Sequence, residues 1–291
     1  MELPSEFEIA GLEHGQVALD DFTVHVAHRG HGDPLVMLHG WPQHWWAWRH
    51  LIAPFTEAGR RVVCPDLRGF GWSGTPGHGY DVDTFATDLI ALLDALGLRR
   101  VDLLAHDWGA YVGFLACLGA PERFRRFVAM SAPSPLIRLT PRKAATLWRY
   151  WYQQPIAAPV LGPRAVRTLH SPRNPIRAWI GLNRLSDEER ARYLQQFNDP
   201  ARVVASVALY RHSVLNLFRR AFTGYYRGAY LRVPTLILHG TADHPTHHVL
   251  HQGLRVQAAQ LDVELLTGVG HLVLDERPDL VLRYTRAFFD A

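Results

Sequence analysis

Short apolar segments alternate with longer segments of helical periodicity along most of the chain. Residues 16–20 and 22–27 alternate between apolar and polar positions, as half-buried antiparallel strands do. Continuous apolar runs, typical of strands buried on both faces, cover residues 34–38, 61–64, 101–104, 127–130, 235–238 and 263–266. Helical segments are predicted at residues 44–58, 82–96, 110–119, 249–259 and 279–289. This alternation predicts an α/β fold with a mostly parallel, eight-stranded sheet flanked by helices.

Residues 133–230 interrupt this alternation. The segment has many prolines, together with helical stretches at 144–152, 187–197 and 202–218. It holds 16 Lys and Arg against 4 Asp and Glu, a net charge of +12, whereas the remainder of the chain carries −8. We therefore expect a core domain formed by residues 1–132 and 231–291, with residues 133–230 inserted as a helical cap.

The bulk composition is that of an ordinary globular protein, with 48% hydrophobic and 20% charged residues. The first residues are acidic and lack the pattern of a secretory signal, and no apolar run approaches the length of a membrane span. The two cysteines, Cys64 and Cys117, lie in apolar segments and are expected to be buried thiols. These features predict a cytoplasmic protein without an integral membrane segment.

The strand-like run at 99–104 is followed by Ala105-His106-Asp107-Trp108-Gly109 and then by a helical segment. A strand, a tight turn flanked by small residues and a helix form the context of a nucleophile elbow. The residue at its tip is Asp107 rather than a serine, which favours displacement at an sp³ carbon through an alkyl-enzyme ester. Asp243 and His271 follow in later loops, which gives the order nucleophile, acid and histidine of a hydrolytic triad.

Two backbone N–H groups are expected to stabilise an oxyanion beside this carboxylate. One belongs to Trp41, in the loop 38–42 that follows a predicted strand. The other belongs to Trp108, at the start of the helix after the elbow. The loop 38–42 has to turn sharply, so Pro42 is expected to follow a cis peptide bond.

In this order and spacing, the motifs resemble those of the α/β-hydrolases that include epoxide hydrolases and haloalkane dehalogenases. The motifs lie at residues 39–42, 66–74, 106–110, 240–243 and 270–271, and the resemblance extends over essentially the whole chain. It implies the α/β-hydrolase fold and assigns Asp107, Asp243 and His271 to the catalytic triad. The His-Gly-Trp-Pro motif favours epoxide hydrolases, because many dehalogenases carry asparagine or glutamate at the position of Trp41.

Opening an epoxide requires an acid that protonates the leaving alkoxide, and epoxide hydrolases usually supply two cap tyrosines for it. The segment 207–211 resembles the one that bears the second tyrosine, which implies this role for Tyr210. At the position of the first tyrosine this chain has Trp148. Tyr150 or Tyr152 is the alternative, if the local helix is rotated or differs in register.

The resemblance implies a hydrolase that converts epoxides to vicinal diols through an ester on Asp107. The expected substrates are a small apolar epoxide and water, without a metal or an organic cofactor. The residues expected to line the substrate pocket are His39, His106, Trp148 and Tyr152. A homodimer is left open, and nucleic-acid binding is not expected, because no arginine groove with interleaved aromatic residues is evident. Two alternatives also remain: a haloalkane dehalogenase with the same triad, and a non-catalytic ligand-binding homologue, against which the intact triad argues.

Overall fold

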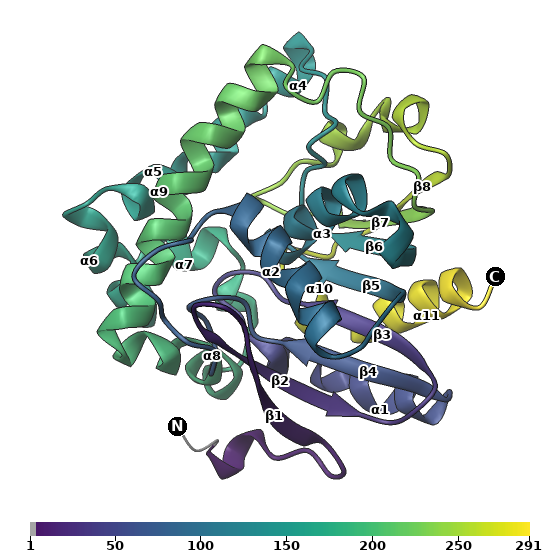
Figure 1. Ribbon diagram of the computed structural model, residues 1–291. Coiled ribbons are helices and arrows are strands. Elements are labelled where there is room, and N and C mark those ends of the chain that lie inside the picture. Colours follow the sequence, from purple (N-terminus) through teal and green to yellow (C-terminus); the bar gives the residue numbers. More distant parts are fainter. Residues whose placement is uncertain (1–3) are drawn as a thin grey trace.

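One mixed sheet runs through the protein in the computed structural model, which describes residues 4–291 (Figure 1). The strands are β1 (Glu13–Ala18), β2 (Thr23–Arg29), β3 (Asp33–Leu38), β4 (Arg60–Pro65), β5 (Val101–His106), β6 (Phe124–Met130), β7 (Thr235–Gly240) and β8 (Leu261–Leu266). Their order across the sheet is β1-β2-β4-β3-β5-β6-β7-β8. Strand β2 is antiparallel to β1 and β4, and the other neighbouring strands are parallel. The predicted mostly parallel sheet of eight strands is confirmed.

Helices cover both faces of the sheet (Figure 1). They are α1 (Arg49–Glu57), preceded by the 3-10 turn η2 (Trp45–Trp48), then α2 (Val82–Ala95), α3 (Trp108–Gly119), α10 (Val273–Glu276) and α11 (Pro278–Phe289). Helices α2 and α3 pack together on one face, and α1 and α11 pack together on the other. Every residue of β5 and of β7 is buried, as expected for strands enclosed between two helical layers.

The helix predicted at 249–259 is not present. The chain forms two short 3-10 turns there, η8 (His248–His251) and η9 (Leu254–Gln257). Between them, Gly253 has φ +76°, a left-handed conformation that stops a helix. The prediction is therefore wrong for this segment, because Gly253 interrupts the helix that the apolar periodicity predicts.

The segment between β6 and β7 is built from helices that lie over the carboxyl ends of the strands (Figure 1). They are α4 (Pro141–Ala144), η4 (Leu147–Tyr152), α5 (Gln153–Ala157), α6 (Leu161–Arg167), η5 (Thr168–His170), α7 (Pro175–Trp179), η6 (Leu182–Arg184), α8 (Asp187–Leu194), η7 (Gln195–Asn198) and α9 (Pro200–Thr223). The longest, α9, is N-capped by Asp199, whose carboxylate accepts the N–H of Ala201, and C-capped by Gly224 in the left-handed conformation. The predicted helix at 144–152 is instead mostly the tighter η4.

Ion pairs fasten these helices to the rest of the chain. The guanidinium of Arg49 donates to Asp275 of α10 at 2.7 Å and to Glu189 of α8 at 2.6 Å. Arg184 pairs with Glu276 of α10 at 2.6 Å. Asp275 and Glu276 of α10 follow closely after His271. The ion pairs therefore connect the helices between β6 and β7 to the part of the chain that carries His271.

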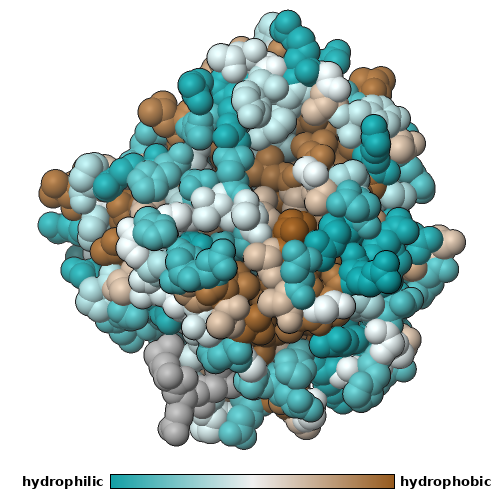
Figure 2. All heavy atoms as spheres, in the orientation of Figure 1, coloured by the Kyte–Doolittle hydropathy of each residue, from teal (hydrophilic) through white to brown (hydrophobic). Residues whose placement is uncertain are grey.

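The face shown in Figure 1 is mainly hydrophilic, with smaller hydrophobic areas between the polar side chains (Figure 2). Cys64 and Cys117 are both buried and form no disulfide, as predicted. Among residues 4–291, no helix has both the length and the apolar character needed to cross a membrane.

Candidate active site

Asp107 occupies the sharp turn between β5 and α3. Its backbone has φ 49° and ψ −122°, and a positive φ is unfavourable for a residue with a Cβ atom. The Asp107 N–H donates to the Met130 carbonyl of β6 at 2.9 Å. Gly109 is required in the next turn, because a Cβ there would collide with the carbonyl groups of Leu38 and His39. The expected strand-turn-helix geometry is thus present, with the carboxylate at the carboxyl edge of the sheet.

The loop after β3 reaches the Asp107 carboxylate directly. The backbone N–H of Trp41 donates to Asp107 Oδ2 at 2.9 Å. This approach needs Gly40, because a Cβ at that position would lie 2.6 Å from the same oxygen. Burial raises the pKa of Asp107 above its ordinary value, while His271 and the backbone N–H groups of Trp108 and Trp41 act in the opposite direction. The carboxylate therefore lies in a largely buried site with hydrogen-bond donors on one side.

His271 lies between two carboxylates. Its Nδ1 is 3.1 Å from Asp243 Oδ2, and its Nε2 is 3.7 Å from Asp107 Oδ1. Asp243 is buried, and its other oxygen accepts the N–H of Thr246 at 2.9 Å. Burial alone lowers the pKa of His271, but Asp243 and Asp107 raise it to about 9. Asp243 thus orients the ring so that Nε2 faces Asp107.

Tyr210 of α9 lies against the two tryptophans that flank this carboxylate. Its ring meets Trp41 edge-on at a centroid distance of 5.2 Å and Trp108 at 5.3 Å. The Trp41 indole N–H donates to Ser206 Oγ, one turn earlier on α9, at 3.0 Å. The peptide bond between Trp41 and Pro42 is cis, as predicted. Helix α9 is therefore in direct contact with both loops that surround Asp107.

Tyr152 of η4 pairs with Tyr210. The two rings meet edge-on with centroids 6.3 Å apart. Burial raises the pKa of both phenols well above the ordinary value, and the nearby charge of Asp107 raises both further. Tyr150 instead packs edge-on against Phe218 with centroids 6.3 Å apart. Of the two alternatives for the first tyrosine, Tyr152 is the one that the fold brings to Tyr210.

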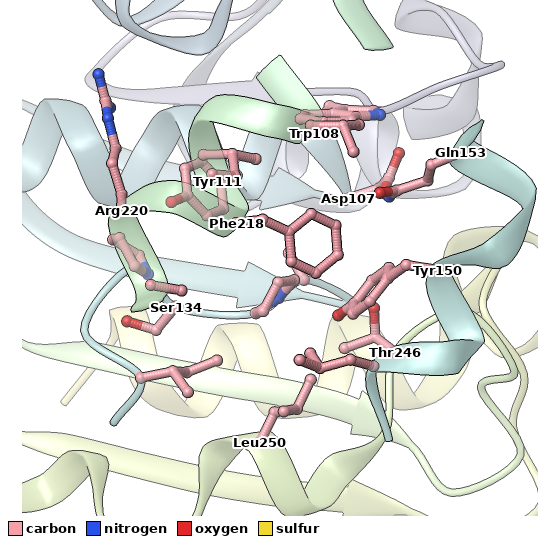
Figure 3. A pocket seen from close by; sticks show the side chains of 18 of the residues that line it. Asp107, Trp108, Tyr111, Ser134, Tyr150, Gln153, Phe218, Arg220, Thr246 and Leu250 are labelled. Carbon is pink, nitrogen blue, oxygen red and sulfur yellow. The ribbon is translucent and has the colours of Figure 1, made fainter. Parts of the chain in front are cut away.

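A cavity of about 120 Å³ lies beside Asp107 (Figure 3). Trp108, Tyr150 and Tyr152 also line it. Much of the remaining wall is apolar and includes Ile137, Leu147, Val214, Leu217, Phe218 and Leu250. In Figure 3, Asp107 lies near Trp108 and Gln153, and Tyr150 lies between Asp107 and Thr246. A small, mostly apolar chamber with a few polar groups suits a small organic molecule.

The expectation that Trp148 lines the pocket is wrong. Its side chain is 60% exposed and packs against Trp179 of α7. Residues 147–152 form a 3-10 helix, which turns by about 120° per residue instead of the 100° of an α-helix. Residues four apart share a face in an α-helix but diverge in a 3-10 helix. Trp148 consequently faces outward while Tyr152 faces the cavity.

His39 and His106 are also absent from the cavity wall, contrary to expectation. His39 is buried, with Nδ1 donating to the Gly40 carbonyl and Nε2 accepting the Leu67 N–H. His106 Nε2 donates to the His271 carbonyl at 2.8 Å, and burial lowers the pKa of His106 to about 3. Both histidines thus hold neighbouring loops in place through hydrogen bonds to backbone groups. His106 is the last residue of β5, whereas Asp107 lies in the following turn, so these two neighbours do not share the cavity wall.

Three residues that contact the Asp243 loop were not predicted from the sequence, namely Thr246, His239 and Arg149. The Thr246 N–H bonds to Asp243, and the Thr246 carbonyl accepts from His239 Nε2 at 3.0 Å. Arg149 of η4 donates to the carbonyls of Asp243 and His244 at 3.2 and 3.0 Å. The spacing of Asp243 and Thr246 is a local signal, since aspartate often accepts an N–H a few residues later. Arg149 carries no such signal, because it lies 94 positions before Asp243.

The histidine-rich segment 244–251 does not form a metal site. In the part of the chain that the structure describes, no group of three or more His, Cys, Asp or Glu is arranged to hold a metal ion. Instead, His251 Nε2 bonds to His239 Nδ1 at 3.0 Å. The pair supports the Asp243 loop from within the core.

Among known proteins, the chain is similar to several epoxide hydrolases. It is 38% identical over 122 residues to epoxide hydrolase 2 of Siraitia grosvenorii, which covers 41% of this chain and 39% of that one. It is 43% identical over 103 residues to the soluble epoxide hydrolase of a Corynebacterium species, which covers 35% of this chain and 36% of the relative. These two matches thus span well under half of either relative's length.

Two comparisons extend over most of the chain. Epoxide hydrolase A of Mycobacterium tuberculosis is 29% identical, over 85% of this chain and 87% of that one. The crystal structure of epoxide hydrolase VrEH1 from Vigna radiata superimposes with a TM-score of 0.80 at 25% identity, covering 97% of this chain and 99% of that one. The resemblance to epoxide hydrolases is therefore confirmed. The family model described as alpha/beta hydrolase fold matches residues 33–278, and the chain belongs to that family.

Proposed function

We propose that the protein hydrolyses epoxides to vicinal diols through a covalent ester on Asp107. The observation that carries the proposal is the Tyr152–Tyr210 pair. Tyr152 lines the cavity together with Asp107, and the Tyr210 ring packs against Trp41 and Trp108 beside the carboxylate, so the pair can supply protonated hydroxyls to the epoxide oxygen. The similarity to proteins named epoxide hydrolases supports the same reaction.

In the first step, the Asp107 carboxylate attacks one carbon of the epoxide ring. The bond between that carbon and the ring oxygen breaks, and its electron pair goes to the oxygen. Tyr152 and Tyr210 donate hydrogen bonds to this oxygen, and one of them transfers its proton. The product is a hydroxyalkyl ester on Asp107 together with a tyrosinate.

In the second step, His271 takes a proton from a water molecule, and the resulting hydroxide attacks the carbonyl carbon of the ester. The tetrahedral oxyanion is stabilised by the N–H groups of Trp41 and Trp108. Its collapse breaks the bond between the carbonyl carbon and the alkoxide oxygen. The proton of the added hydroxyl passes to the alkoxide, which releases the diol and restores the Asp107 carboxylate. The proton on His271 returns to the tyrosinate through the solvent, so epoxide and water are consumed one for one.

The haloalkane dehalogenase alternative is less well supported. A dehalogenase needs donors for the departing halide, and the indole N–H groups of Trp41 and Trp108 are the candidates beside Asp107. The Trp41 indole N–H already donates to Ser206. The tyrosine pair, in contrast, matches the need of an alkoxide for a proton, which a halide does not share.

The helical segment between β6 and β7 contributes both tyrosines to the proposed site. We propose that residues 133–230 act as a cap that closes over the substrate, because η4 and α9 carry Tyr152 and Tyr210.

The unpaired, buried thiols of Cys64 and Cys117 suit a reducing compartment and support a cytoplasmic location.

A direct assay tests the proposed function. The protein is incubated with a panel of aryl and aliphatic epoxides and, in parallel, with 1-haloalkanes, and both diol and free halide are measured. Diol formation that disappears in Asp107→Asn is the expected result. Halide release without any diol would contradict the proposal in favour of the dehalogenase, and neither product would favour the non-catalytic binder.

A further inference from the structure

Tyr150 lines the cavity and carries a hydroxyl group that the reaction described above does not use. Its oxygen is buried and has no hydrogen-bond partner among residues 4–291. A buried hydroxyl without a partner lowers stability, so its presence in a folded protein needs an explanation. The ring does not pair with Tyr210, which contacts Tyr152 instead.

Thr246 is a polar neighbour of this hydroxyl. Its side chain lines the same cavity, and it lowers the pKa of Tyr150 (Figure 3). The backbone of Thr246 is already engaged with Asp243 and His239. The hydroxyl groups of Tyr150 and Thr246 thus lie in the cavity wall among apolar side chains such as Phe218 and Leu250.

The position of Tyr150 is fixed from two sides. Its ring packs against Phe218 of α9. The preceding residue, Arg149, donates to the carbonyls of Asp243 and His244, and its own carbonyl accepts the Trp179 indole N–H at 3.0 Å. The hydroxyl is consequently held against the Asp243 loop before any ligand binds, and such preorganisation favours binding.

The surrounding charges select the kind of ligand. Burial raises the pKa of Tyr150, and both Asp243 and Asp107 raise it further, so the phenol stays protonated and can donate a hydrogen bond. The same two carboxylates disfavour an anion at this place. A neutral oxygen is therefore the group that fits, with Tyr150 as donor and the Thr246 hydroxyl as donor or acceptor.

We propose that Tyr150 and Thr246 form a subsite for a neutral oxygen substituent, a hydroxyl or a carbonyl, carried by the substrate beside its epoxide ring. The inference rests on the proposed function and narrows the substrate class to epoxides with such a substituent, for example 2,3-epoxy alcohols. The substituent satisfies the Tyr150 hydroxyl while the ring carbon faces Asp107. Tyr150 is thereby a specificity residue, distinct from the tyrosine pair that acts on the ring oxygen.

The test compares kcat/KM for 2,3-epoxyhexan-1-ol with kcat/KM for 2,3-epoxyhexane, which lacks only the hydroxyl. Tyr150→Phe and Thr246→Val are each expected to lower the ratio of these two values about tenfold, since each removes one hydrogen bond to the substituent. Thr246→Ser keeps the hydroxyl and is expected to retain the ratio. Tyr230→Phe, on an exposed tyrosine outside the cavity, is the matched control.

Two results would overturn the inference. An unchanged ratio in both Tyr150→Phe and Thr246→Val would show that the hydroxyls do not contact the substituent. An equal loss for the two substrates in Tyr150→Phe would assign Tyr150 to ring opening or to folding. If the unmodified protein forms diol from neither compound, the proposed function fails separately. In that case calorimetric binding of hexane-1,2,3-triol against hexane-2,3-diol decides on the subsite, with Tyr150→Phe expected to remove the preference for the triol.

Discussion

The Nε2 atom of His271 lies 3.7 Å from Asp107 Oδ1, close enough for the two charges to interact but beyond hydrogen-bond distance. In the free protein, Asp107 helps Asp243 to raise the pKa of His271 to about 9. Formation of an ester removes the charge of Asp107. The pKa of His271 should then fall, so the proposed first step favours the neutral imidazole that the second step needs.

The first prediction concerns the loss of this base. His271→Gln is expected to allow ester formation but to slow ester hydrolysis by at least about 10²-fold, the lower end of the contribution of a positioned base. The protein should gain the mass of one substrate molecule, detectable by mass spectrometry after denaturation. Asp107→Asn, which removes the nucleophile, should show no such gain. Normal turnover by His271→Gln would exclude the assigned role.

The second prediction follows the oxygen atoms. Because water attacks the carbonyl carbon of the ester, the diol receives its new oxygen from the Asp107 carboxylate in the first turnover. A single turnover in ¹⁸O-labelled water should therefore place the label in the peptide that contains Asp107. Label in the diol instead would mean that water attacks the epoxide directly.

The third prediction is a pH dependence with a defined sign. His271 acts as a base only when neutral, so ester hydrolysis should increase as pH rises through its pKa in the ester, which lies below about 9. Asp243 stabilises the charged imidazole, so Asp243→Asn should move this limb to lower pH while reducing the maximal rate. Single-turnover rates across the neutral and alkaline range measure both effects. A shift to higher pH would contradict the assignment.

The first step has the opposite requirement. Asp107 attacks only when ionised, and burial raises its pKa above the ordinary value for aspartate. Ester formation should therefore decline in mildly acidic solution, at a higher pH than expected for an exposed carboxyl group. The rate of mass gain in His271→Gln isolates this step. Because this variant also lacks the His271 charge that lowers the pKa of Asp107, the decline should appear there at a still higher pH.

The fourth prediction separates the tyrosines from the tryptophan that stands where a tyrosine was expected. Loss of both acid hydroxyls in Tyr152→Phe/Tyr210→Phe should slow ester formation by about 10²–10⁴-fold, with smaller losses in the single variants. Trp148→Phe should leave the rate unchanged, because its side chain is exposed and does not line the cavity. A larger effect of Trp148→Phe than of Tyr152→Phe would exclude Tyr152 as the partner of Tyr210 in ring opening.

The fifth prediction concerns stability. Asp275 is buried and accepts hydrogen bonds from Gln43, Arg49 and Tyr193 at 2.7–2.9 Å. Asp275→Ala leaves the buried Arg49 with one partner fewer and should lower the free energy of unfolding by about 3–5 kcal/mol, measured by urea denaturation. Asp279→Ala, which removes an exposed partner of Arg277, should leave it nearly unchanged.

Much of the fold could be predicted from local patterns. Strands such as residues 101–104 are continuous apolar runs because helices cover both faces of the sheet. Such a run consists of consecutive residues, so it can be recognised in the sequence. The same holds for Asp107, Asp243 and His271, whose positions after strands place them at one edge of a parallel sheet. The helix predicted at 249–259 was wrong, because Gly253 adopts a left-handed conformation that apolar periodicity does not reveal.

The sequence by itself determined the strand order along the chain, the aspartate at the turn after β5, and the acid and histidine that follow it. Only the tertiary structure decided that Tyr152 rather than Tyr150 or Trp148 meets Tyr210, because the pitch of η4 sets which side chain faces inward. Only the tertiary structure placed Tyr150 beside Thr246 and Arg149 on the Asp243 loop. These contacts join residues about 95 positions apart. They depend on how the helices between β6 and β7 pack onto the sheet, and a local sequence pattern does not predict that packing.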